Sequence, residues 1–504
     1  MKAARSITSD FLSGANSLKP FYAQALNNLD FGQAMANKSF TDAARKTLVD
    51  VLTLQYEGLS VSSKTQQNIR ALASANTFTV TTGHQLGLMG GALFTVYKVL
   101  SVIRLCEELA KKHPEAHFVP LFWIHTEDHD FAEINHYYPD FLTQKTYTAH
   151  FEGPVGKHIL DPEIEALIPD NFTGSLTAAF AAGKTLAQAF RDWAIALFDE
   201  MGLLILDPNQ AQLKAQFVEV MQAEVLSNTS LLAVKQTTSE LIQAGYAQQI
   251  EPREINLFYM TDKLRGRIVK VGDFYEVLGS FHRFTQASLL EWMRSNPDSF
   301  SPNVCLRPLF QELILPNLAY IGGWGELSYW VQLKGVFEAH GVAFPVLLPR
   351  FSATIFTQSQ ANEFQQLGFE LPDIRQSLTQ LNQQLENTRL DLSHYNDLAH
   401  KLHLMWSAIA DASQEHELQR SALSFQTKNE HLLRSLRKKW IREMRKKSPD
   451  FAQLTQLKQA ISPDGLVQER VWSLAAIPTD IPNFIAQVKA KCQPLDFTHQ
   501  AIVV

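Results

Sequence analysis

The chain has 504 residues, of which 45% are hydrophobic and 19% are charged. This composition excludes intrinsic disorder, and the length predicts a large core with at least one further module. The 45 basic and 51 acidic residues give a net charge of −6, so we do not expect a nucleic-acid partner. No apolar signal segment opens the sequence, and no apolar run reaches the roughly 18 residues that span a bilayer. We therefore expect a cytoplasmic protein without membrane contact.

The three cysteines, Cys106, Cys305 and Cys492, lie far apart, and none belongs to a Cys-x-x-Cys pair. This pattern excludes a disulfide framework and a cysteine-based zinc site. We expect each cysteine to be a small buried apolar residue rather than a nucleophile.

The chain begins with helical patterns, at residues 41–52 and 65–72, and its first strand is predicted at residues 77–82, TFTVTT. A glycine-punctuated turn, GHQLGLMGG, follows at residues 83–91, and the next segment has the apolar spacing of a helix. A strand, a glycine-rich turn and a helix in this order open many nucleotide-binding α/β sheets. The turn predicts an anion-binding cradle that includes Gly83, His84, Gln85 and Gly87. Its spacing matches neither GxGxxG nor a Walker loop, and a purely structural turn is the alternative.

A second strand is predicted at residues 120–124, PLFWI, and the polar cluster His125-Thr126-Glu127-Asp128-His129-Asp130 follows it directly. Carboxylates and imidazoles at the carboxyl end of a buried strand can bind a metal, transfer protons or hold an amine. His125 and His129 would share a face only if this segment were helical, so the spacing does not establish a zinc pair. The alternative is a solvated acidic turn with capping carboxylates.

The third strand is predicted at residues 202–208, GLLILDP, and insertions precede and follow it. Residues 137–200 are too many for a plain crossover helix. The second insertion, at residues 209–301, ends with the alternating segments NLFYMTD, RIVKVG and FYEVLGSF, which predict a small antiparallel meander.

Arg307 lies in the otherwise apolar stretch NVCLRPLFQELILP, where a guanidinium needs a carboxylate, a phosphate or a buried ion-pair partner. A fourth strand, at residues 318–323, ends in a second glycine turn with Gly322, Gly323, Gly325 and Glu326. A fifth strand is predicted at residues 344–350. The pattern predicts an α/β fold with a Rossmann-like, doubly wound parallel sheet. In the order 3-2-1-4-5, both glycine turns face the crevice where such sheets bind ligands.

Residues 371–462 contain no glycine, which favours long helices. Two apolar seams with coiled-coil spacing predict a helical hairpin in this segment, and Asn429 is a candidate register-setting residue in the second seam. The seams consist of Ile374, Leu378, Leu381, Leu385, Thr388 and Leu392, and of Leu418, Ala422, Phe425, Asn429, Leu432 and Leu436. We interpret the basic run at residues 434–447 as a solvated face.

These patterns predict seven segments. They are residues 1–136, with the N-terminal helices and the first half of the core; 137–200, the first connecting insertion; 201–208, a core strand; 209–301, the second connecting insertion; 302–370, the second half of the core; 371–462, the coiled-coil arm; and 463–504, a C-terminal segment packed on the core.

Four motifs carry a resemblance to a known family. They are TGHQLGLMGGALFTVYK, PLFWIHTEDHDFAEIN, RPLFQELILPNLAYIGGWGELSYW and FPVLLPR, and they occur in this order. The chain resembles the bacillithiol biosynthesis family BshC, the cysteine ligases. The resemblance implies a core similar to class I nucleotidyltransferases with two connecting insertions, and a coiled-coil domain through which a homodimer forms. It also implies a reaction that joins the carboxyl group of L-cysteine to the amine of glucosaminyl malate.

Carried over residue by residue, the resemblance assigns Glu127, Asp128, His129 and Asp130 to the family's acidic-histidine motif. It assigns Gly83, His84, Gln85 and Gly87 to one glycine motif, and Gly322, Gly323, Gly325 and Glu326 to the other. A KMSKS-type signature is absent, so the resemblance alone does not imply an adenylate. ATP is a candidate cosubstrate and Mg²⁺ a candidate cofactor, and no residue is assigned to a metal.

We hypothesise that the glycine turns hold phosphate or the cysteine carboxylate, and that Asp128 with His129 orients and deprotonates the attacking amine. Two alternatives stay open. One is a metal-dependent hydrolase that uses the HTEDHD cluster, and the other is a coiled-coil scaffold or RNA-binding protein that uses the basic arm.

Overall fold

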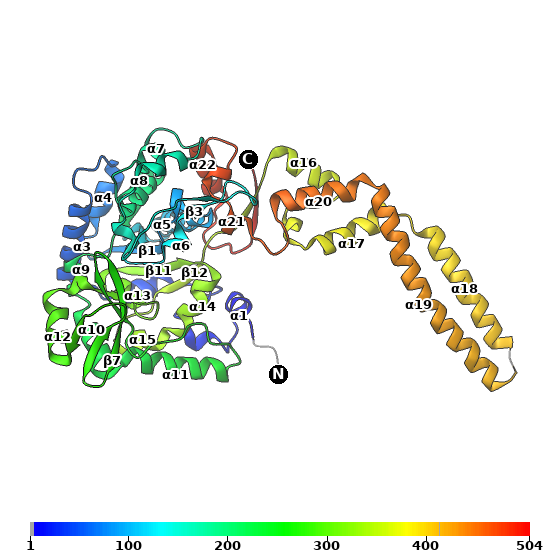
Figure 1. The fold of residues 1–504 in the computed structure, drawn as a ribbon, viewed down its shortest axis with the longest axis horizontal. Coiled ribbons are helices and arrows are strands. Elements are labelled where there is room, and N and C mark those ends of the chain that lie inside the picture. Colours follow the sequence, from blue (N-terminus) through cyan, green and yellow to red (C-terminus); the bar gives the residue numbers. More distant parts are fainter. Residues whose placement is uncertain (1–4, 413) are drawn as a thin grey trace. The chain divides into compact units, whose positions relative to one another are not determined.

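The computed structural model describes residues 5–412 and 414–504, and the chain divides into two compact units (Figure 1). The first comprises Met1–Ser352 and Glu469–His499, and the second comprises Ala353–Gln468 and Gln500–Val504. The division at Ser352 lies before position 370, where the composition predicted it. Residues 353–370 therefore belong with the arm, and only part of the segment 463–504 belongs to the core.

A five-stranded parallel sheet forms the centre of the first unit. Its order is β12-β11-β1-β2-β5, which is the predicted order read from the other edge. The strands are β1 (Thr77–His84), β2 (His117–Ile124), β5 (Leu204–Leu206), β11 (Asn317–Gly322) and β12 (Val346–Pro349). Nearly every residue in them is buried, because helices cover both faces of a parallel sheet and favour continuous apolar runs.

Helices from distant parts of the sequence surround this sheet. The helix α5 packs on β1 and β2 and also contacts α22, near the end of the chain. The helices of the first half are α1 (Ile7–Ser13), α2 (Phe31–Asn37), α3 (Asp42–Gln55), α4 (Ser63–Ala71), α5 (Phe94–Lys112), α6 (Phe131–Ile134), α7 (Ser175–Ala179) and α8 (Leu186–Phe198). Those of the second half are α9 (Ala211–Ala215), α10 (Val218–Ser227), α11 (Thr229–Gln243), α12 (Gln286–Ser295), α13 (Arg307–Ile314), α14 (Trp324–Gln332), α15 (Lys334–Ala339) and α22 (Ile481–Lys491).

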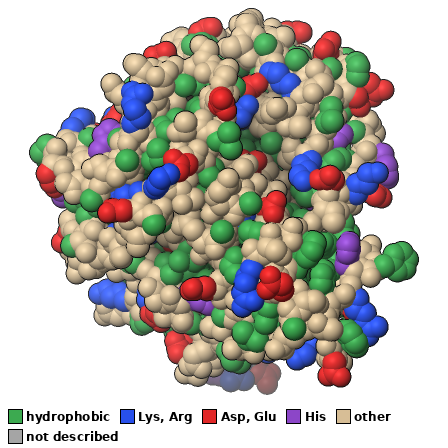
Figure 2. Space-filling model, turned by 90° about the vertical axis from the view of Figure 1, so that its left-hand side faces the viewer, with side chains coloured by type: hydrophobic (Ala, Val, Ile, Leu, Met, Phe, Trp, Pro, Cys, Tyr) green, Lys and Arg blue, Asp and Glu red, His purple; other side chains and the backbone are tan. Residues whose placement is uncertain are grey.

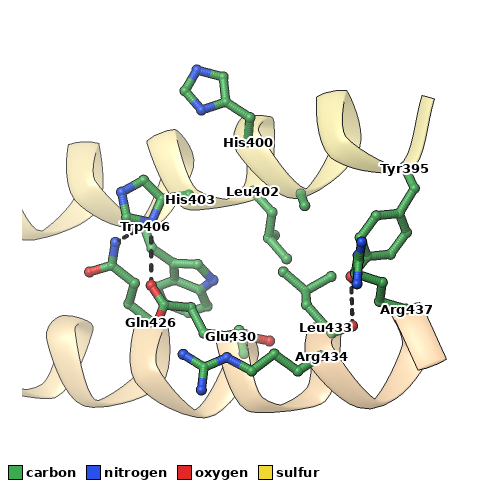
Figure 3. A pocket seen from close by; sticks show the side chains of 12 residues that line it. Tyr395, His400, Leu402, His403, Trp406, Gln426, Glu430, Leu433, Arg434 and Arg437 are labelled. Atoms are coloured by element: carbon green, nitrogen blue, oxygen red, sulfur yellow. Dashed lines mark hydrogen bonds and ion pairs between the residues drawn. The ribbon is translucent and has the colours of Figure 1, made fainter. Parts of the chain in front are cut away.

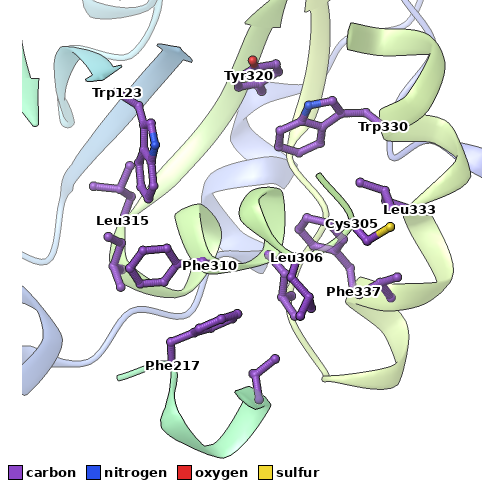
Figure 4. Close-up of a cluster of buried hydrophobic side chains, with 14 of the residues drawn as sticks. Trp123, Phe217, Cys305, Leu306, Phe310, Leu315, Tyr320, Trp330, Leu333 and Phe337 are labelled. Carbon is purple, nitrogen blue, oxygen red and sulfur yellow. The ribbon is translucent and has the colours of Figure 1, made fainter. Parts of the chain in front are cut away.

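Aromatic side chains pack against one another in one hydrophobic cluster of the core (Figure 4). The rings of Tyr320 and Trp330 are stacked with centroids 4.3 Å apart. Phe310, on α13, contacts Trp123 of β2 edge to face, with centroids 5.5 Å apart. This packing fixes α13, which begins at Arg307, against the ends of β2 and β11.

The second insertion carries the predicted meander. Five antiparallel strands are paired in the order β10-β6-β7-β8-β9, so this prediction is confirmed. The strands are β6 (Leu257–Thr261), β7 (Leu264–Val271), β8 (Phe274–Val277), β9 (Arg283–Thr285) and β10 (Phe300–Pro302). The first insertion holds the short pair β3 (His136–Tyr137) and β4 (Lys145–Thr146).

The second unit joins a small two-stranded sheet to a set of helices. Its strands β13 (Ala353–Phe356) and β14 (Gln500–Val503) pair in parallel. The helices are α16 (Gln358–Gln366), α17 (Leu378–Arg389), α18 (Ser393–Ala412), α19 (His416–Lys447) and α20 (Pro449–Ile461). A helical hairpin was predicted, and α18 and α19 form it (Figure 1).

The pairing of the two seams differs from the prediction. Leu381 and Leu385 of the first seam are buried in α17 and cluster with Phe451 and Leu454 of α20, because most of this seam lies on α17, which ends at Arg389 before α18 begins. Of the second seam, Phe425 stacks on Trp406 of α18. Several apolar side chains of the second seam, including that of Leu432, stay exposed.

All three cysteines are buried, as expected. Burial raises the pKa of the thiols of Cys305 and Cys492 to about 12, so neither is a ready nucleophile. Among the described residues, no helix has the length and apolar character that crossing a bilayer requires.

Candidate active site

The loops that follow β1, β2 and β11 meet at the carboxyl edge of the sheet. Gln85, in the first glycine turn, donates from Nε2 to Oδ2 of Asp128 over 2.8 Å. Lys98, on α5, donates to the carbonyl oxygen of Gly83 over 2.9 Å. The same ammonium lies 2.6 Å from Oε2 of Glu326, in the second glycine turn. The three predicted segments thus converge, as the strand order requires.

Lys98 and Glu326 form a buried ion pair between the two glycine turns. Lys98 is only 1% exposed, so its ammonium is not solvated. Glu326 also accepts hydrogen bonds from the hydroxyl of Tyr320 and the backbone N–H of Gly323, each over 2.8 Å. Burial alone would raise the pKa of Glu326, but Lys98 and these donors lower it to about 2. The Glu326 carboxylate is therefore ionised, and both of its oxygens have partners.

The glycines of the first turn are required by packing. A Cβ atom at Gly83 would lie 3.1 Å from Nε2 of His125 and 3.2 Å from the carbonyl oxygen of Trp123. A Cβ atom at Gly87 would lie 2.7 Å from Cα of Gly91. The close approach at Gly83 is thus made by the end of β2.

Several amides of this turn already have partners. The N–H groups of Gly87, Gly90 and Gly91 donate to carbonyl oxygens within residues 85–88 over 2.9 to 3.0 Å. The N–H of Leu93 donates to the carbonyl oxygen of Trp472. An anion at this turn would therefore need donors other than these four amides.

His84 packs its ring edge to face on Phe94, with centroids 4.7 Å apart. Burial and the nearby Lys98 ammonium hold the pKa of His84 well below its usual value. Its imidazole is therefore neutral at physiological pH.

Asp128 is the most strongly stabilised anion of the acidic-histidine cluster. It accepts from the backbone N–H of His129 over 2.8 Å and lies 3.7 Å from Nη1 of Arg265. Partial burial would raise the pKa of Asp128, but hydrogen bonds from His129 and Gln85 and the Arg265 charge hold it far below its usual range. Asp128 is therefore a permanent carboxylate in the crevice.

His129 is about half exposed, and its Nδ1 lies 3.1 Å from Nη1 of Arg265. Because a guanidinium can only donate, Nδ1 accepts this hydrogen bond and the neutral ring carries its proton on Nε2. Arg265 thereby sets the tautomer of His129. The guanidinium is held by two further contacts, a ring contact with Phe258 at 3.9 Å and a hydrogen bond to Oγ of Ser301.

Glu127 and Asp130 differ in burial and in their partners. Glu127 is buried, forms an ion pair with Lys214, and accepts from Oγ of Ser301 over 2.7 Å. Asp130 is exposed and caps α6, where its Oδ1 accepts from the N–H of Glu133. Asp130 is therefore a solvated capping carboxylate, which is the structural alternative for this cluster.

A cavity of about 450 Å³ lies beside this cluster. Residues from the end of β2, the β6–β7 hairpin and the start of α13 line it, among them Trp123, His125, Asp128, Arg265 and Arg307. Nε2 of His125 is buried without a hydrogen-bond partner. Burial, with Arg307 as the next cause, lowers the pKa of His125 to about 3. The site therefore combines a carboxylate, neutral imidazoles and guanidinium groups.

Sequence reasoning missed Lys98, Lys214 and Arg265, although each contacts a predicted residue. A signal for Lys98 was present, since it is the lone charge in the stretch FTVYKVLSVI. The same argument identified Arg307. Lys214 and Arg265 reach the cluster from the second insertion, and no local pattern marks that contact.

The structure offers no ligand set for the hydrolase alternative. Within residues 5–412 and 414–504, no three His, Cys, Asp or Glu side chains are placed to hold a metal ion. On the face of the first unit that Figure 2 shows, acidic and basic side chains are interspersed.

Two family models match the chain. The first is described as the N-terminal Rossmann-like domain of the bacillithiol biosynthesis protein BshC and matches residues 1–351. The second is described as the C-terminal coiled-coil domain of BshC and matches residues 353–504. The boundary between them agrees with the division of the structure at Ser352.

Curated relatives share this similarity over most of their length. A protein of Cytophaga hutchinsonii, named "Putative cysteine ligase BshC", is 34% identical over 97% of this chain and 95% of its own. Relatives with the same name from Flavobacterium johnsoniae and Geobacillus thermodenitrificans are 40% and 27% identical, over 72% and 100% of this chain and 71% and 99% of their own. With both domains matched in order and the predicted motifs gathered at one crevice, this chain belongs to the BshC family of bacillithiol biosynthesis.

Proposed function

We propose that this chain is a cysteine ligase that joins the carboxyl group of L-cysteine to the amine of glucosaminyl malate. Family membership supports the reaction class, because the curated relatives are named cysteine ligases. The observation that carries the proposal is the cavity beside β2, which is lined by both the carboxylate of Asp128 and the guanidinium of Arg307. Such a lining suits a substrate with both an amine and carboxylates.

Amide formation from a free carboxylate is uphill in water, so we propose that the cysteine carboxylate attacks a phosphorus atom of ATP. A bond between the carboxyl oxygen and phosphorus forms, a P–O bond of ATP breaks, and the rest of the nucleotide or its pyrophosphate leaves. Mg²⁺ would balance the phosphate charge. In the activated form, the amine attacks the carboxyl carbon, the C–N bond forms, and the phosphate-bearing oxygen leaves with its electron pair. The amine must lose a proton for this attack. The contribution of the protein is then to position both partners and accept that proton.

The charged groups in the crevice suggest a role for each residue. We propose that Asp128 holds the substrate ammonium, since its carboxylate is ionised, and that His129 accepts the proton. In the free protein, Arg265 occupies Nδ1 of His129, so this contact must loosen when the amine arrives. The two glycine turns, joined by Lys98 and Glu326, would hold phosphate or the cysteine carboxylate nearby.

The direct test is incubation of the purified chain with L-cysteine and glucosaminyl malate, followed by mass spectrometry. Parallel reactions omit ATP, Mg²⁺ or both. We expect bacillithiol only in the complete reaction. Product without ATP would contradict the activation step alone, and no product under any condition, with the chain folded, would contradict the ligase proposal.

We further propose a homodimer in which a second copy covers the hairpin of α18 and α19. Leu404, Leu432 and Leu436 are about half to two-thirds exposed on these helices. A groove of about 360 Å³ between the two helices is lined by Trp406 and Leu433 (Figure 3). Exposed apolar side chains on a two-helix hairpin are stabilised when another hairpin packs on them.

A further inference from the structure

We propose that the cavity beside β2 contains a subsite for a dicarboxylate, and that this subsite takes the malyl group of the amine substrate. The inference rests on the proposed ligase function and assigns one part of its substrate to named residues. Three arginines carry it: Arg253, Arg267 and Arg307.

These three arginines line the same cavity from three parts of the chain. Arg253 precedes β6, Arg267 lies on β7, and Arg307 begins α13. In the part of the chain that the structure describes, none of the three forms an ion pair with an acidic side chain. Glu127 and Asp128, which also line the cavity, face Lys214 and Arg265 instead. A third lining carboxylate, Glu251, accepts a hydrogen bond from Gln248. The cavity therefore presents three guanidinium groups that have no carboxylate within ion-pair distance among the described residues.

Arg307 is the one of the three whose guanidinium lies among aromatic rings. Its guanidinium carbon lies 5.8 Å from the ring centroid of Trp123 and 5.7 Å from that of Tyr320. Its Nη1 donates to the side-chain oxygen of Gln311 over 3.1 Å, and its buried Nη2 has no partner. Aromatic contacts thus fix the planar group while donors remain for a carboxylate, the partner that matches this fork.

Arg267 and Arg265 are two residues apart on β7, so they extend from the same face of the strand. Arg265 is committed to the protein through Ser301 and the Phe258 ring. Arg267 is exposed, and among residues 5–412 and 414–504 its guanidinium forms no ion pair or ring contact. One face of β7 therefore supplies one arginine beside Asp128 and another for a ligand.

The charges are arranged as the substrate would require. Asp128, a carboxylate suited to an ammonium group, shares the cavity with the three arginines suited to two carboxylates. Glucosaminyl malate carries an amine on its sugar and two carboxylates on its malyl group. The amine of this substrate would bind Asp128, and its malyl carboxylates would bind the arginines. Bidentate arginine contacts would select the malyl group.

Nucleotide phosphates could bind the same arginine donors, so the test must distinguish malyl carboxylates from phosphates. Isothermal titration calorimetry on the full chain uses four probes: L-malate, glucosaminyl malate, methyl glucosaminide and ATP. The variants are Arg307→Met and Arg267→Gln. The matched control is Arg294→Gln, because Arg294 is exposed on α12, where its Nη1 lies 3.4 Å from Oε2 of Glu291 on the same helix.

We expect Arg307→Met to weaken binding of L-malate and glucosaminyl malate by roughly tenfold to a hundredfold, the scale of a lost charge-assisted hydrogen bond. Arg267→Gln should weaken both in the same direction, and binding of methyl glucosaminide should not change. The control should bind every probe as the wild type does. Circular dichroism at 25 °C checks that the variants are folded.

Unchanged affinity for glucosaminyl malate in both folded variants would overturn the subsite, as would a loss confined to ATP, which would assign the arginines to phosphate. The outcome is independent of turnover. If the arginine variants lose malate binding while the wild type forms no amide, the subsite stands and the ligase proposal fails.

Discussion

Nζ of Lys98 lies 2.6 Å from Oε2 of Glu326, and this buried ion pair joins the turn after β1 to the turn after β11. Lys98 also holds the carbonyl oxygen of Gly83, and Glu326 holds the N–H of Gly323. Two strands that are far apart in the sequence thus have their ends fixed by one pair of charges. Neither charge is free to act on a substrate without breaking this link.

Removing one partner of the pair should destabilise the core. Lys98→Met leaves the Glu326 carboxylate in a largely buried place, and such a loss costs about 3–5 kcal/mol. The double variant Lys98→Met, Glu326→Gln should recover part of that free energy, because no uncompensated charge remains. Urea unfolding followed by tryptophan fluorescence measures both.

The exposed pair of Lys46 and Asp50, with 77% and 60% of their side chains accessible, provides the control. Lys46→Met should change the free energy of unfolding by less than about 1 kcal/mol. Equal effects of Lys98→Met and Lys46→Met would show that the link between the turns is not structural.

His125 should make the core less stable in mild acid. Its pKa is about 3 in the folded chain, through burial and then Arg307, and about 6.5 in an unfolded chain. The unfolded state therefore binds a proton first, so stability is fully present above pH 6.5 and falls as the pH drops toward 3. Between pH 7 and pH 5 the loss from this residue is about 2 kcal/mol.

The variant His125→Gln tests this assignment. It removes the titrating group, so its stability should fall less than that of the wild type over the same pH range. Urea unfolding at pH 5, 6 and 7 measures the difference. Parallel pH profiles for the two proteins would assign the acid sensitivity to other groups.

The strand order could be predicted because buried parallel strands leave a strong local pattern. Runs such as PLFWI are almost wholly apolar, and the helical segments between them restrict the possible orders. The polar residues of the site could also be located, since the carboxyl ends of such strands collect them. What these side chains contact could not be predicted.

Contacts across long stretches of sequence explain the misses. Arg265 reaches Asp128, and Lys214 reaches Glu127, from an insertion whose placement no local pattern specifies. The predicted pairing of the two seams in the arm was wrong for a related reason. Leu381 has the spacing of a coiled-coil seam, but it packs with Leu454 of α20, and periodicity does not identify the partner helix.

Glycine substitutions should separate packing from ligand binding at the two turns. Gly90 has φ of +89° and lies against the indole of Trp193, so Gly90→Ala should unfold or strongly destabilise the core. Gly323→Ala meets only ordinary contacts, the nearest being Oε2 of Glu326 at 3.5 Å. It should fold normally, with weaker binding of ATP or cysteine if the second turn holds an anion.

Thermal melting and calorimetry with ATP and with L-cysteine provide the two readouts. Gly325→Ala is the matched control, because nothing lies within 4 Å of the added Cβ atom. Wild-type affinity of folded Gly323→Ala and Gly323→Val variants for both ligands would leave that turn a structural feature alone.

The arm should control the oligomeric state. Removal of residues 373–460 should convert the proposed dimer to a monomer in light scattering. A milder test is Leu432→Glu, which places a charge on an apolar side chain that is 68% exposed, and so should disrupt a dimer without unfolding α19. A deletion variant that remains dimeric at micromolar concentration would place the interface elsewhere.

His129→Ala and Asp128→Asn should lower turnover by at least roughly a hundredfold, the scale expected for the loss of a positioned general base. His129 is about half exposed, so its removal should leave the melting temperature almost unchanged, and the exposed His150→Ala is the control for a lost imidazole. The pKa of Asp128 is far below its usual range, so its charge is constant between pH 6 and pH 9. The activity of His129→Ala should therefore rise with pH only as the substrate amine deprotonates without assistance.

Near-normal turnover of both folded variants at neutral pH would mean that the base lies elsewhere. Glu326 would be a poor replacement, because its carboxylate already binds Lys98, Tyr320 and the N–H of Gly323.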